Sequence, residues 1–401
     1  MPPDVDRLRA TIQHLARIER PSASDGERVA AEWIAARLRD LGLEARVEVE
    51  RAHGTYWVPL GLMTAGAAVA GLACGRMPAV AVGAAAALGI ADDVSGGAHR
   101  FRRLLPHGST YNVVAEAGDP DGERTIVFVA HHDAAHGGLI FTPQLVTWVA
   151  DAFPDWYARQ ETSPQVMRLV VAGPALVALG ALARRRVMRR AGAAMALLSA
   201  LAFADIAARR VVPGANDNLS GVAAVLELAR LLAEQPVEGV RVLLVSTGSE
   251  ESFMEGMRGF ARRHFPVLPR DTTEVVCLDS VGSPQLIVIE GEGMLAMRDY
   301  PSEMRDRLAA AADRAGVAIR RGLRLGLATD GLIALKAGYR SAALGSVTKY
   351  KFPSNYHLQR DTPENVNHET VRAAVAVCHE LVRSSARARR TASSRVDISP
   401  A

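Results

Sequence analysis

The sequence predicts an α/β sandwich into which two apolar helical hairpins are inserted. Short apolar runs, typical of buried strands, alternate with segments whose apolar residues recur at helical spacing. Strands that are apolar on both faces indicate a sheet covered by helices on both sides. The chain has 401 residues, of which 49% are hydrophobic and 22% charged, so it can bury a large core and is not a disordered or low-complexity protein.

The predicted elements follow one another along the chain. Residues 5–43 carry two amphipathic helical blocks, separated by a turn with capping residues at 19–28. Further helices are expected at residues 219–234, 302–315 and 369–383. The strand candidates are residues 45–50, 111–117, 125–130, 240–247, 274–282 and 285–291.

The excess of apolar residues lies in two pairs of uncharged segments. The first pair is 57–75 and 77–91, and the second is 169–183 and 191–204, with the run RRRVMRR between its members. Only residues 57–75 reach the length of about 18 apolar residues expected of a membrane-spanning helix. All four are rich in Ala and Gly, which lets helices pack closely. The pattern leaves open whether a hairpin enters a membrane or forms a soluble helical subdomain.

These segments divide the chain into a discontinuous α/β domain, two insertions and a tail. We expect the α/β domain to comprise residues 1–55, 92–136 and 211–383. The first insertion, residues 56–91, is an apolar hairpin, and the second, residues 137–210, contains the other hairpin. The polar residues 384–401 are expected to be a disordered tail.

Charge and cysteine content exclude several classes of protein. The formal net charge is only +4, and no aromatic-studded basic stripe is present, so a nucleic-acid partner is not expected. Cys74, Cys277 and Cys378 are scattered, which argues against a disulfide framework or a thiolate zinc site and favours a reducing compartment. The polar N-terminal residues show no signal peptide.

Acidic residues and histidines gather where the predicted strands end. In an α/β sheet, functional groups collect at such positions. Histidine nitrogen and carboxylate oxygen are ligands that suit zinc. Two adjacent glutamates repel each other unless a metal is near, and one can bind that metal while the other takes a proton from water. The residues concerned are His131, His132, Asp133, Asp217, Glu250, Glu251, Asp279 and His357.

The order of the surrounding motifs resembles a known enzyme family. The segments AHHD, GANDNLSG, STGSEESFMEGMRGF, CLDSVG and NYHLQRDTPEN are similar to those of the M28 peptidase family, di-zinc exopeptidases typified by bacterial leucyl aminopeptidases. The resemblance covers roughly residues 5–55, 108–136 and 211–383, so the α/β domain is the implied peptidase domain. It also implies a three-layer sandwich with a central mixed sheet.

The resemblance further implies two zinc ions held by five side chains. Asp217 would bridge both ions, His131 and Asp279 would complete one site, and Glu251 and His357 the other. No other cofactor is implied.

The neighbouring residues receive more modest roles. The resemblance implies that Glu250 is the general base and acid, and that Asp133 orients His131. His132 is expected to pack in the interior, and His136 to be a solvated loop residue.

The resemblance also covers one segment near the expected substrate pocket. Thr329 and Asp330 resemble a family segment near the substrate pocket, although Gly331 replaces the usual histidine there. Apart from the resemblance, Asp361, Glu364 and His368 are expected to cap the last helix.

The function implied is that of a zinc-dependent exopeptidase. An aminopeptidase that hydrolyses peptides or small amides through a di-zinc-activated water is the leading hypothesis. A glutaminyl-cyclase-like acyltransferase with one zinc is an alternative within the fold, and a non-catalytic membrane-tethered homologue is an alternative outside catalysis. The complete set of ligands, base and orienting acid favours the enzyme. Sequence does not define the oligomeric state.

The expected location is a membrane surface, with the catalytic domain on the cytoplasmic face, or alternatively the soluble cytoplasm. Membrane association would use residues 57–91 and 169–204. The run RRRVMRR would then lie on the far side, against the positive-inside tendency. Either the second pair does not cross, or the orientation is inverted.

Overall fold

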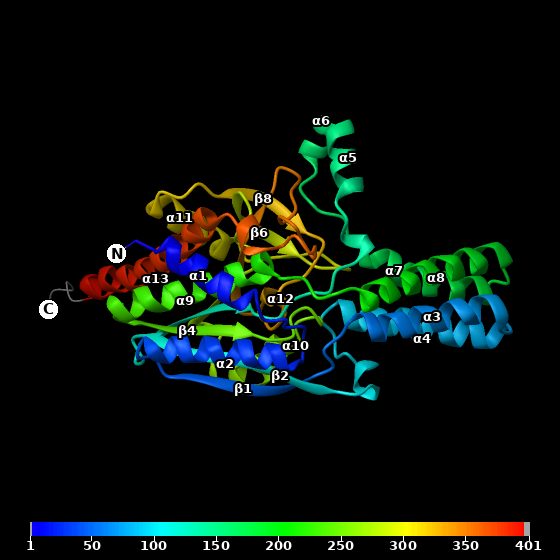
Figure 1. Cartoon of the computed structure of the whole chain (residues 1–401), viewed down its shortest axis with the longest axis horizontal. Coiled ribbons are helices and arrows are strands. Elements are labelled where there is room, and N and C mark those ends of the chain that lie inside the picture. The colour runs from blue at the N-terminus through cyan, green and yellow to red at the C-terminus, as the bar shows by residue number, and fades with distance from the viewer. Residues whose placement is uncertain (1, 397–401) are drawn as a thin grey trace.

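A nine-stranded sheet forms the centre of the structure, a computed structural model that describes residues 2–396, with side chains described as far as Arg387 (Figure 1). Its strands are β1 (Ala45–Ala52), β2 (Gly108–Gly118), β3 (Arg124–His131), β4 (Val240–Thr247), β5 (Thr273–Leu278), β6 (Gln285–Glu292), β7 (Arg298–Asp299), β8 (Arg320–Leu325) and β9 (Arg340–Val347). They lie in the order β1-β2-β4-β3-β5-β9-β6-β7, and β8 pairs with β6. Strands β4, β3, β5 and β9 are parallel, with antiparallel pairs on either side. The expected mixed sheet is therefore confirmed.

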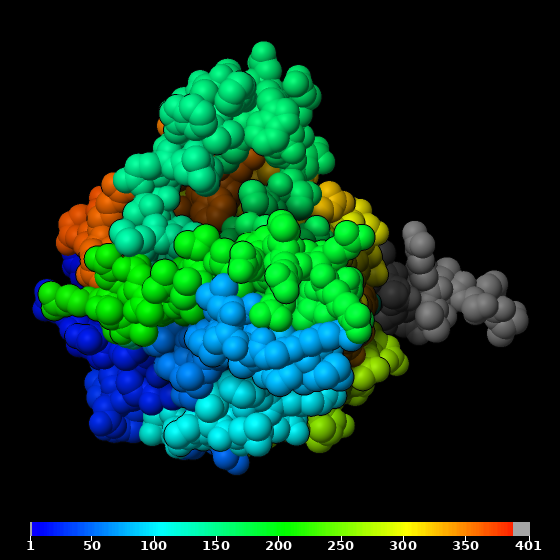
Figure 2. All heavy atoms as spheres, turned by 90° about the vertical axis from the view of Figure 1, so that its right-hand side faces the viewer, coloured from blue at the N-terminus to red at the C-terminus, as the bar shows by residue number. Residues whose placement is uncertain are grey.

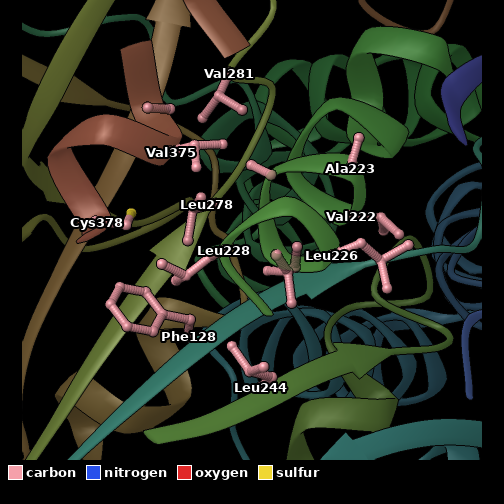
Figure 3. Close-up of a cluster of buried hydrophobic side chains, with 14 of the residues drawn as sticks. Phe128, Val222, Ala223, Leu226, Leu228, Leu244, Leu278, Val281, Val375 and Cys378 are labelled. Carbon is pink, nitrogen blue, oxygen red and sulfur yellow. The ribbon is translucent and has the colours of Figure 1, made fainter. Parts of the chain in front are cut away.

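The strands supply side chains to two cores. Ile126 and Phe128 of β3 pack in one core and Val127 and Val129 in the other, because successive residues of a strand face opposite sides. Figure 3 shows part of the first core, where α9 and α13 meet the sheet. This core is covered by α1 (Val5–Leu15), α2 (Asp25–Asp40), α9 (Ser220–Glu234), α11 (Ser302–Ala315) and α13 (His368–Val396). The second core is covered by α10 (Glu255–His264), α12 (Gly331–Lys336) and the bases of the two hairpins.

Local capping explains where several helices begin. The Asp4 side chain accepts the amides of Asp6 and Arg7 at the start of α1, and Ser24 accepts that of Glu27 in α2. Asn367 takes the same role before α13 by accepting the amide of Thr370. The last helix is therefore capped by Asn367. The sequence had suggested Asp361 in this role, and that expectation was wrong.

Both apolar hairpins form, and they pack together into one four-helix bundle that projects from the α/β domain (Figure 1). The bundle consists of α3 (Trp57–Ala73), α4 (Arg76–Val94), α7 (Met167–Leu182) and α8 (Arg186–Ala208). Its helices touch backbone to backbone: a Cβ added at Gly83 would lie 2.9 Å from the Ala178 nitrogen, and one at Gly192 would lie 2.6 Å from the Val177 nitrogen. Such close contact between small residues is typical of helices in membranes.

The outer surface of the bundle is apolar. By length and composition, α4 and α8 are long enough to cross a membrane, yet only 33% and 28% of their most apolar windows are buried in the structure. Both turns at the free end are basic: Arg189 donates to the carbonyls of Gly71 and Cys74, and Arg76 donates to that of Leu182. Exposed side chains on the shaft include Leu62, Val69, Leu72, Val82, Leu88, Leu179, Leu197, Leu198 and Leu201.

A short helical arm, residues 144–159, branches off beside the base of the bundle. It contains α5 (Gln144–Ala152) and α6 (Pro154–Arg159), and follows the 3-10 turn η2 (Leu139–Phe141). Figure 1 shows the arm running across the direction of the bundle. Lys351 of the α/β domain holds its end by donating to the carbonyls of Tyr157 and Ala158.

The structure differs from the sequence-based boundaries at several points. Helix α4 continues to Val94, and α13 continues to Val396, well into the segment predicted as a disordered tail. The rest of that tail, residues 397–401, lies outside the described residues. Strands β8 and β9 and helices α10 and α12 were not anticipated.

Candidate metal centre and active site

The predicted site residues meet at one edge of the sheet because the parallel strands all end there. His131 is the last residue of β3, Glu250 and Glu251 follow β4, and Asp279 follows β5 directly. Asp217 lies in the irregular turn η3 (Ala215–Leu219) that leads into α9. His357 lies in the long loop after β9 and has a left-handed backbone, with φ of 53°.

Asp217 occupies the middle of this cluster. Its Oδ1 lies 3.3 Å from Nε2 of His131, and its Oδ2 lies 3.3 Å from Nε2 of His357. Glu251 Oε2 is 3.2 Å from the same His357 nitrogen, and Asp279 Oδ2 is 4.0 Å from His131 Nε2. One carboxylate thus faces both histidines with separate oxygens, and each histidine is accompanied by a second acid.

In this arrangement, two groups of three candidate ligand atoms share Asp217, and the atoms of each group lie within 4.8 Å of one another. One consists of His131, Asp217 and Asp279, and the other of Asp217, Glu251 and His357. Together they contain the five side chains expected as ligands, and Asp217 belongs to both groups. A third group joins His131 to Glu250 and Glu251.

Asp133 organises both the histidine and the paired glutamates. Its Oδ1 lies 3.3 Å from Nδ1 of His131, on the side of the ring opposite the cluster. The same carboxylate accepts the amides of Glu250 at 3.0 Å and Glu251 at 3.1 Å, and the hydroxyl of Ser22 at 2.6 Å. An acid in this position fixes the orientation of the ring and increases its basicity as a ligand.

The charges of the cluster are unbalanced without a cation. Burial and neighbouring acids raise the pKa of Glu250 well above its usual range, and burial together with the Asp217 charge raises that of Asp279 to about 7. Burial opposes ionisation of Asp217 too, but hydrogen bonds from His131 and His357 outweigh it and lower its pKa. Glu251 Oε1 is buried with no hydrogen-bond partner. Crowded carboxylates, two histidine nitrogens among them and an unpartnered buried oxygen together fit a site for divalent metal ions.

Arg20 supports the site from beneath, and sequence reasoning missed it. Its side chain is fully buried and donates to the carbonyls of His132 at 2.7 Å, Pro213 at 2.8 Å and Gly214 at 2.9 Å. Burial lowers its pKa to about 10, against the nearby acids, so the guanidinium remains charged at neutral pH. Arg20 therefore ties the loop after His131 to the loop before Asp217.

Two buried acids hold the remaining loops. Glu27 accepts the amides of Ala23 and Ser249 and the Thr110 hydroxyl, which anchors the turn before Glu250. Asp361 accepts the amides of Asn216 at 2.8 Å and Asp217 at 3.1 Å, and burial raises its pKa to about 8. Each acid reaches a partner far away in sequence, so no local signal in the chain identifies these contacts.

The secondary candidates take the following places. His132 is fully buried, and its Nδ1 is 2.9 Å from the Ser246 hydroxyl, so it packs in the interior as expected. His136 contacts the ring of Trp57 with centroids 4.5 Å apart, and is not a freely solvated residue.

The segment expected near the substrate pocket reaches it in part. Thr329 lines the cleft, and Asp330 is buried beside it and accepts a hydrogen bond from Thr247. A side chain at Gly331 would collide with the Tyr300 hydroxyl, which explains why no histidine fits there.

A narrow cleft opens onto the cluster. Its lining includes the acids and His357 together with apolar side chains. The apolar lining comprises Ile287, Ile289, Leu325, Leu327, Ala328 and Pro353. A ligand bound there would have a polar end at the acids and an apolar portion against this wall.

Comparison with known proteins connects this geometry to a family. The model of peptidase family M28 matches residues 200–382, a range that includes Asp217, Glu250, Glu251, Asp279 and His357. Residues 200–382 thus match the M28 peptidase family. The match confirms the family expected from the motifs and, with it, the expectation of a peptidase-type enzyme. A search of curated protein sequences finds no match.

Solved structures share the fold of nearly the whole chain, including the residues that precede the range matched by the M28 model. A glutaminyl cyclase from Bacteroides thetaiotaomicron is similar with a TM-score of 0.57 and 14% identity, covering 96% of this chain and 98% of that chain. A Zn-dependent exopeptidase from Parabacteroides distasonis is similar with a TM-score of 0.56 and 14% identity, covering 96% of this chain and 99% of that chain. A leucine aminopeptidase precursor from Bacteroides thetaiotaomicron is similar with a TM-score of 0.55 and 14% identity, covering 96% of this chain and 98% of that chain. At this identity, the similarities establish the shared fold.

Proposed function

We propose that the protein is a zinc-dependent aminopeptidase that removes N-terminal residues from peptides or small amides, using two zinc ions. The observation that carries the proposal is the position of Asp217, whose two carboxylate oxygens each lie 3.3 Å from a different histidine. Such a carboxylate suits a bridge between two metals, with His131 and Asp279 as ligands on one side and Glu251 and His357 on the other.

The chain's own residues supply the proton transfers. When bound, zinc ions polarise the scissile carbonyl and lower the pKa of water. Glu250 lies beside the cluster, with Oε2 3.9 Å from His131 Nε2, and burial raises its pKa well above the usual range of a glutamate. It is thus suited to take a proton from the attacking water and pass it to the leaving amine. Asp133 holds Glu250 by its amide and keeps His131 oriented.

The apolar wall of the cleft favours substrates with an apolar first residue. Ile287, Ile289 and Leu325 line the same cleft as the acids, and the side chain of a bound N-terminal residue would be desolvated against them. The free α-amine of a peptide substrate carries a positive charge, which suits the acidic side chains that line the cleft.

Removal of metal gives a direct test of this proposal. Treatment with a chelator is expected to abolish hydrolysis of leucine amides, and addition of zinc is expected to restore it at two ions per chain. One tightly bound zinc with cyclisation of an N-terminal glutamine would instead support the cyclase alternative. Correctly folded protein that binds two zinc ions but hydrolyses no aminoacyl substrate would contradict the proposal.

We also propose that the four-helix bundle spans a membrane. Its helices have 16 to 23 residues, which gives about 24–35 Å at 1.5 Å per residue, close to the roughly 30 Å hydrocarbon core of a bilayer. A bundle in water would present a polar outer face, whereas this one exposes Leu, Val and Met around its shaft. Its arginines at the free end can reach anionic headgroups.

The bundle also bears on the two topologies that the sequence left open. Because both hairpins pack in one bundle, they cross together, and Arg76 lies at the same end as the second hairpin's arginine-rich turn. The positive-inside tendency places this end in the cytoplasm. The catalytic domain then lies on the opposite face, contrary to the orientation first expected from the polar N-terminus.

Carbonate extraction and thiol labelling test both statements. The full-length protein is expected to stay in the membrane fraction at alkaline pH; release as a soluble monomer or as a soluble dimer would contradict insertion. Cys74 lies in the turn between α3 and α4, whereas Cys277 and Cys378 are buried. An impermeant maleimide should therefore label inside-out vesicles and spare intact cells. The reverse pattern would place the catalytic domain in the cytoplasm.

A further inference from the structure

The insertion that carries the second hairpin packs against a residue of the active site. The Phe141 ring lies against that of His357, with centroids 4.4 Å apart. In the same turn, Leu139 donates its amide to the Asp205 carboxylate of α8 at 2.7 Å. The turn η2 therefore connects a candidate ligand directly to the base of the bundle. Leu139 and its neighbour Ile140 are themselves exposed.

The first hairpin begins equally close to the site. Tyr56, which immediately precedes α3, stacks on Phe253 with centroids 5.0 Å apart, and Phe253 follows Glu251 by two residues. Phe203 of α8 meets the same tyrosine at 6.2 Å. The loops that hold the acids are thus in contact with the base of both hairpins, and the site lies at the level where the bundle leaves the α/β domain.

The segment that returns from the arm contacts the chain on either side of a cleft residue. Ser163 donates its amide to the Arg324 carbonyl and accepts the amide of Gly326. These contacts flank Leu325, which belongs to the apolar lining. The insertion at residues 137–210 therefore contacts His357 before the arm and the neighbours of Leu325 after it.

The arm has the composition of a segment that lies in a membrane interface. It exposes Leu145, Trp148, Phe153 and Trp156, with 71%, 62%, 55% and 51% of their surfaces accessible. Trp and other aromatic residues are enriched at the level of lipid headgroups. Figure 2, which looks along the bundle from its free end, shows a hollow between the arm and the bundle that opens toward the viewer. The hollow therefore faces the same side as the bundle's free end.

We propose that the active site works at the bilayer surface on peptides held in the membrane by an apolar anchor. The inference rests on the proposed aminopeptidase function and on insertion of the bundle. The substrate has a free α-amine that enters the acid-lined cleft and a C-terminal part that remains in the bilayer. Water adds across the first amide, so that its oxygen joins the acyl carbon and a proton passes to the leaving nitrogen. A free amino acid is released, and the shortened peptide stays in the membrane.

The proposal explains why exposed apolar residues surround the rim of a hydrolytic site. Leu139, Ile140 and the arm residues would be costly in water, but they become buried once the rim contacts lipid. Confinement of enzyme and substrate to one surface also raises their effective concentration, by factors of about 10² or more in tethered systems.

Reconstituted full-length enzyme tests the inference. Zinc-loaded protein in phosphatidylcholine vesicles is given two peptides with the same N-terminal leucine sequence, one carrying a palmitoylated C-terminal lysine and one without the acyl chain. A third peptide ends in a transmembrane helix. Rates are divided by the number of outward-facing enzyme molecules. We expect kcat/KM for both anchored peptides to exceed that for the free peptide at least tenfold.

The outcomes separate the two proposals. Equal rates for free and anchored peptides, with efficient hydrolysis of both, would overturn the membrane-substrate inference and leave the aminopeptidase proposal intact. Hydrolysis of neither peptide by zinc-loaded enzyme would overturn the aminopeptidase proposal itself.

Surface variants test whether the arm contributes. The double substitution Trp148→Ser and Trp156→Ser is expected to reduce the ratio of anchored to free rates at least threefold. Val267→Ser is the matched control, because Val267 is 73% exposed on the α/β domain outside the arm and the bundle. An unchanged ratio in the arm variant would remove the arm from the proposal.

Discussion

Glu250→Gln is expected to lower kcat by about 10²–10⁴-fold, the usual contribution of a general acid and base. The amide has nearly the shape of the carboxylate but cannot accept the proton of the attacking water. Because the Glu250 main-chain amide, and not its side chain, donates to Asp133, the loop should keep its position. Hydrolysis of leucine p-nitroanilide and zinc content measure the two effects.

Controls make this result specific. Glu44→Gln changes an exposed glutamate in the turn between α2 and β1 and should leave kcat unaltered. The Glu250 variant should retain wild-type zinc stoichiometry and melting temperature. Full activity in this variant would exclude Glu250 as the base.

Arg20→Met is expected to reduce the free energy of unfolding by about 3–5 kcal/mol, the range seen when one partner of a buried ionic network is removed. Five main-chain carbonyls lose a hydrogen bond from the guanidinium, and the acids of the site lose a nearby cation. Urea denaturation of the metal-free protein measures the change. Zinc affinity should fall as well, because Arg20 fixes the loops before Asp217 and after His131.

Arg20→Lys keeps the folded protein available if the methionine variant does not fold. A lysine retains the charge but cannot reproduce the planar fork of donors, so an intermediate loss is expected. Arg17→Met, at an exposed position, should change stability by less than about 0.5 kcal/mol. Equal stability of wild type and Arg20→Lys would show that charge alone is required.

The sequence predicted the parts of the fold whose signals are local. Apolar runs such as residues 125–130 and 240–247 identified central strands, because such strands are buried on both faces. The ends of those strands then located His131, Glu250 and Glu251. Strand β9 was missed because RSAALGSV consists largely of small residues with weak β-propensity. The Ala- and Arg-rich end of α13 was misjudged as a tail, although both residues are strong helix formers.

The supporting residues of the site could not be inferred in this way. Arg20 bonds to residues more than 100 positions away, and Asp361 bonds to amides more than 140 positions away. Each contact depends on the closing of the tertiary structure and leaves no periodicity or motif. The packing of both hairpins into one bundle was hidden for the same reason, since each hairpin alone is compatible with several partners.

The junction between bundle and sheet has a practical consequence for making a water-soluble form of this protein. Leu60 of α3 and Ile206 of α8 lie in the same core as Val127 and Ile289 of the central strands. Deleting the hairpins would uncover that face of the sheet and remove Asp205 of α8, which accepts a hydrogen bond from the turn packed on His357. A crystallographer who wants a detergent-free sample should therefore keep all four helices and exchange outward residues such as Leu88 and Leu198 for polar ones.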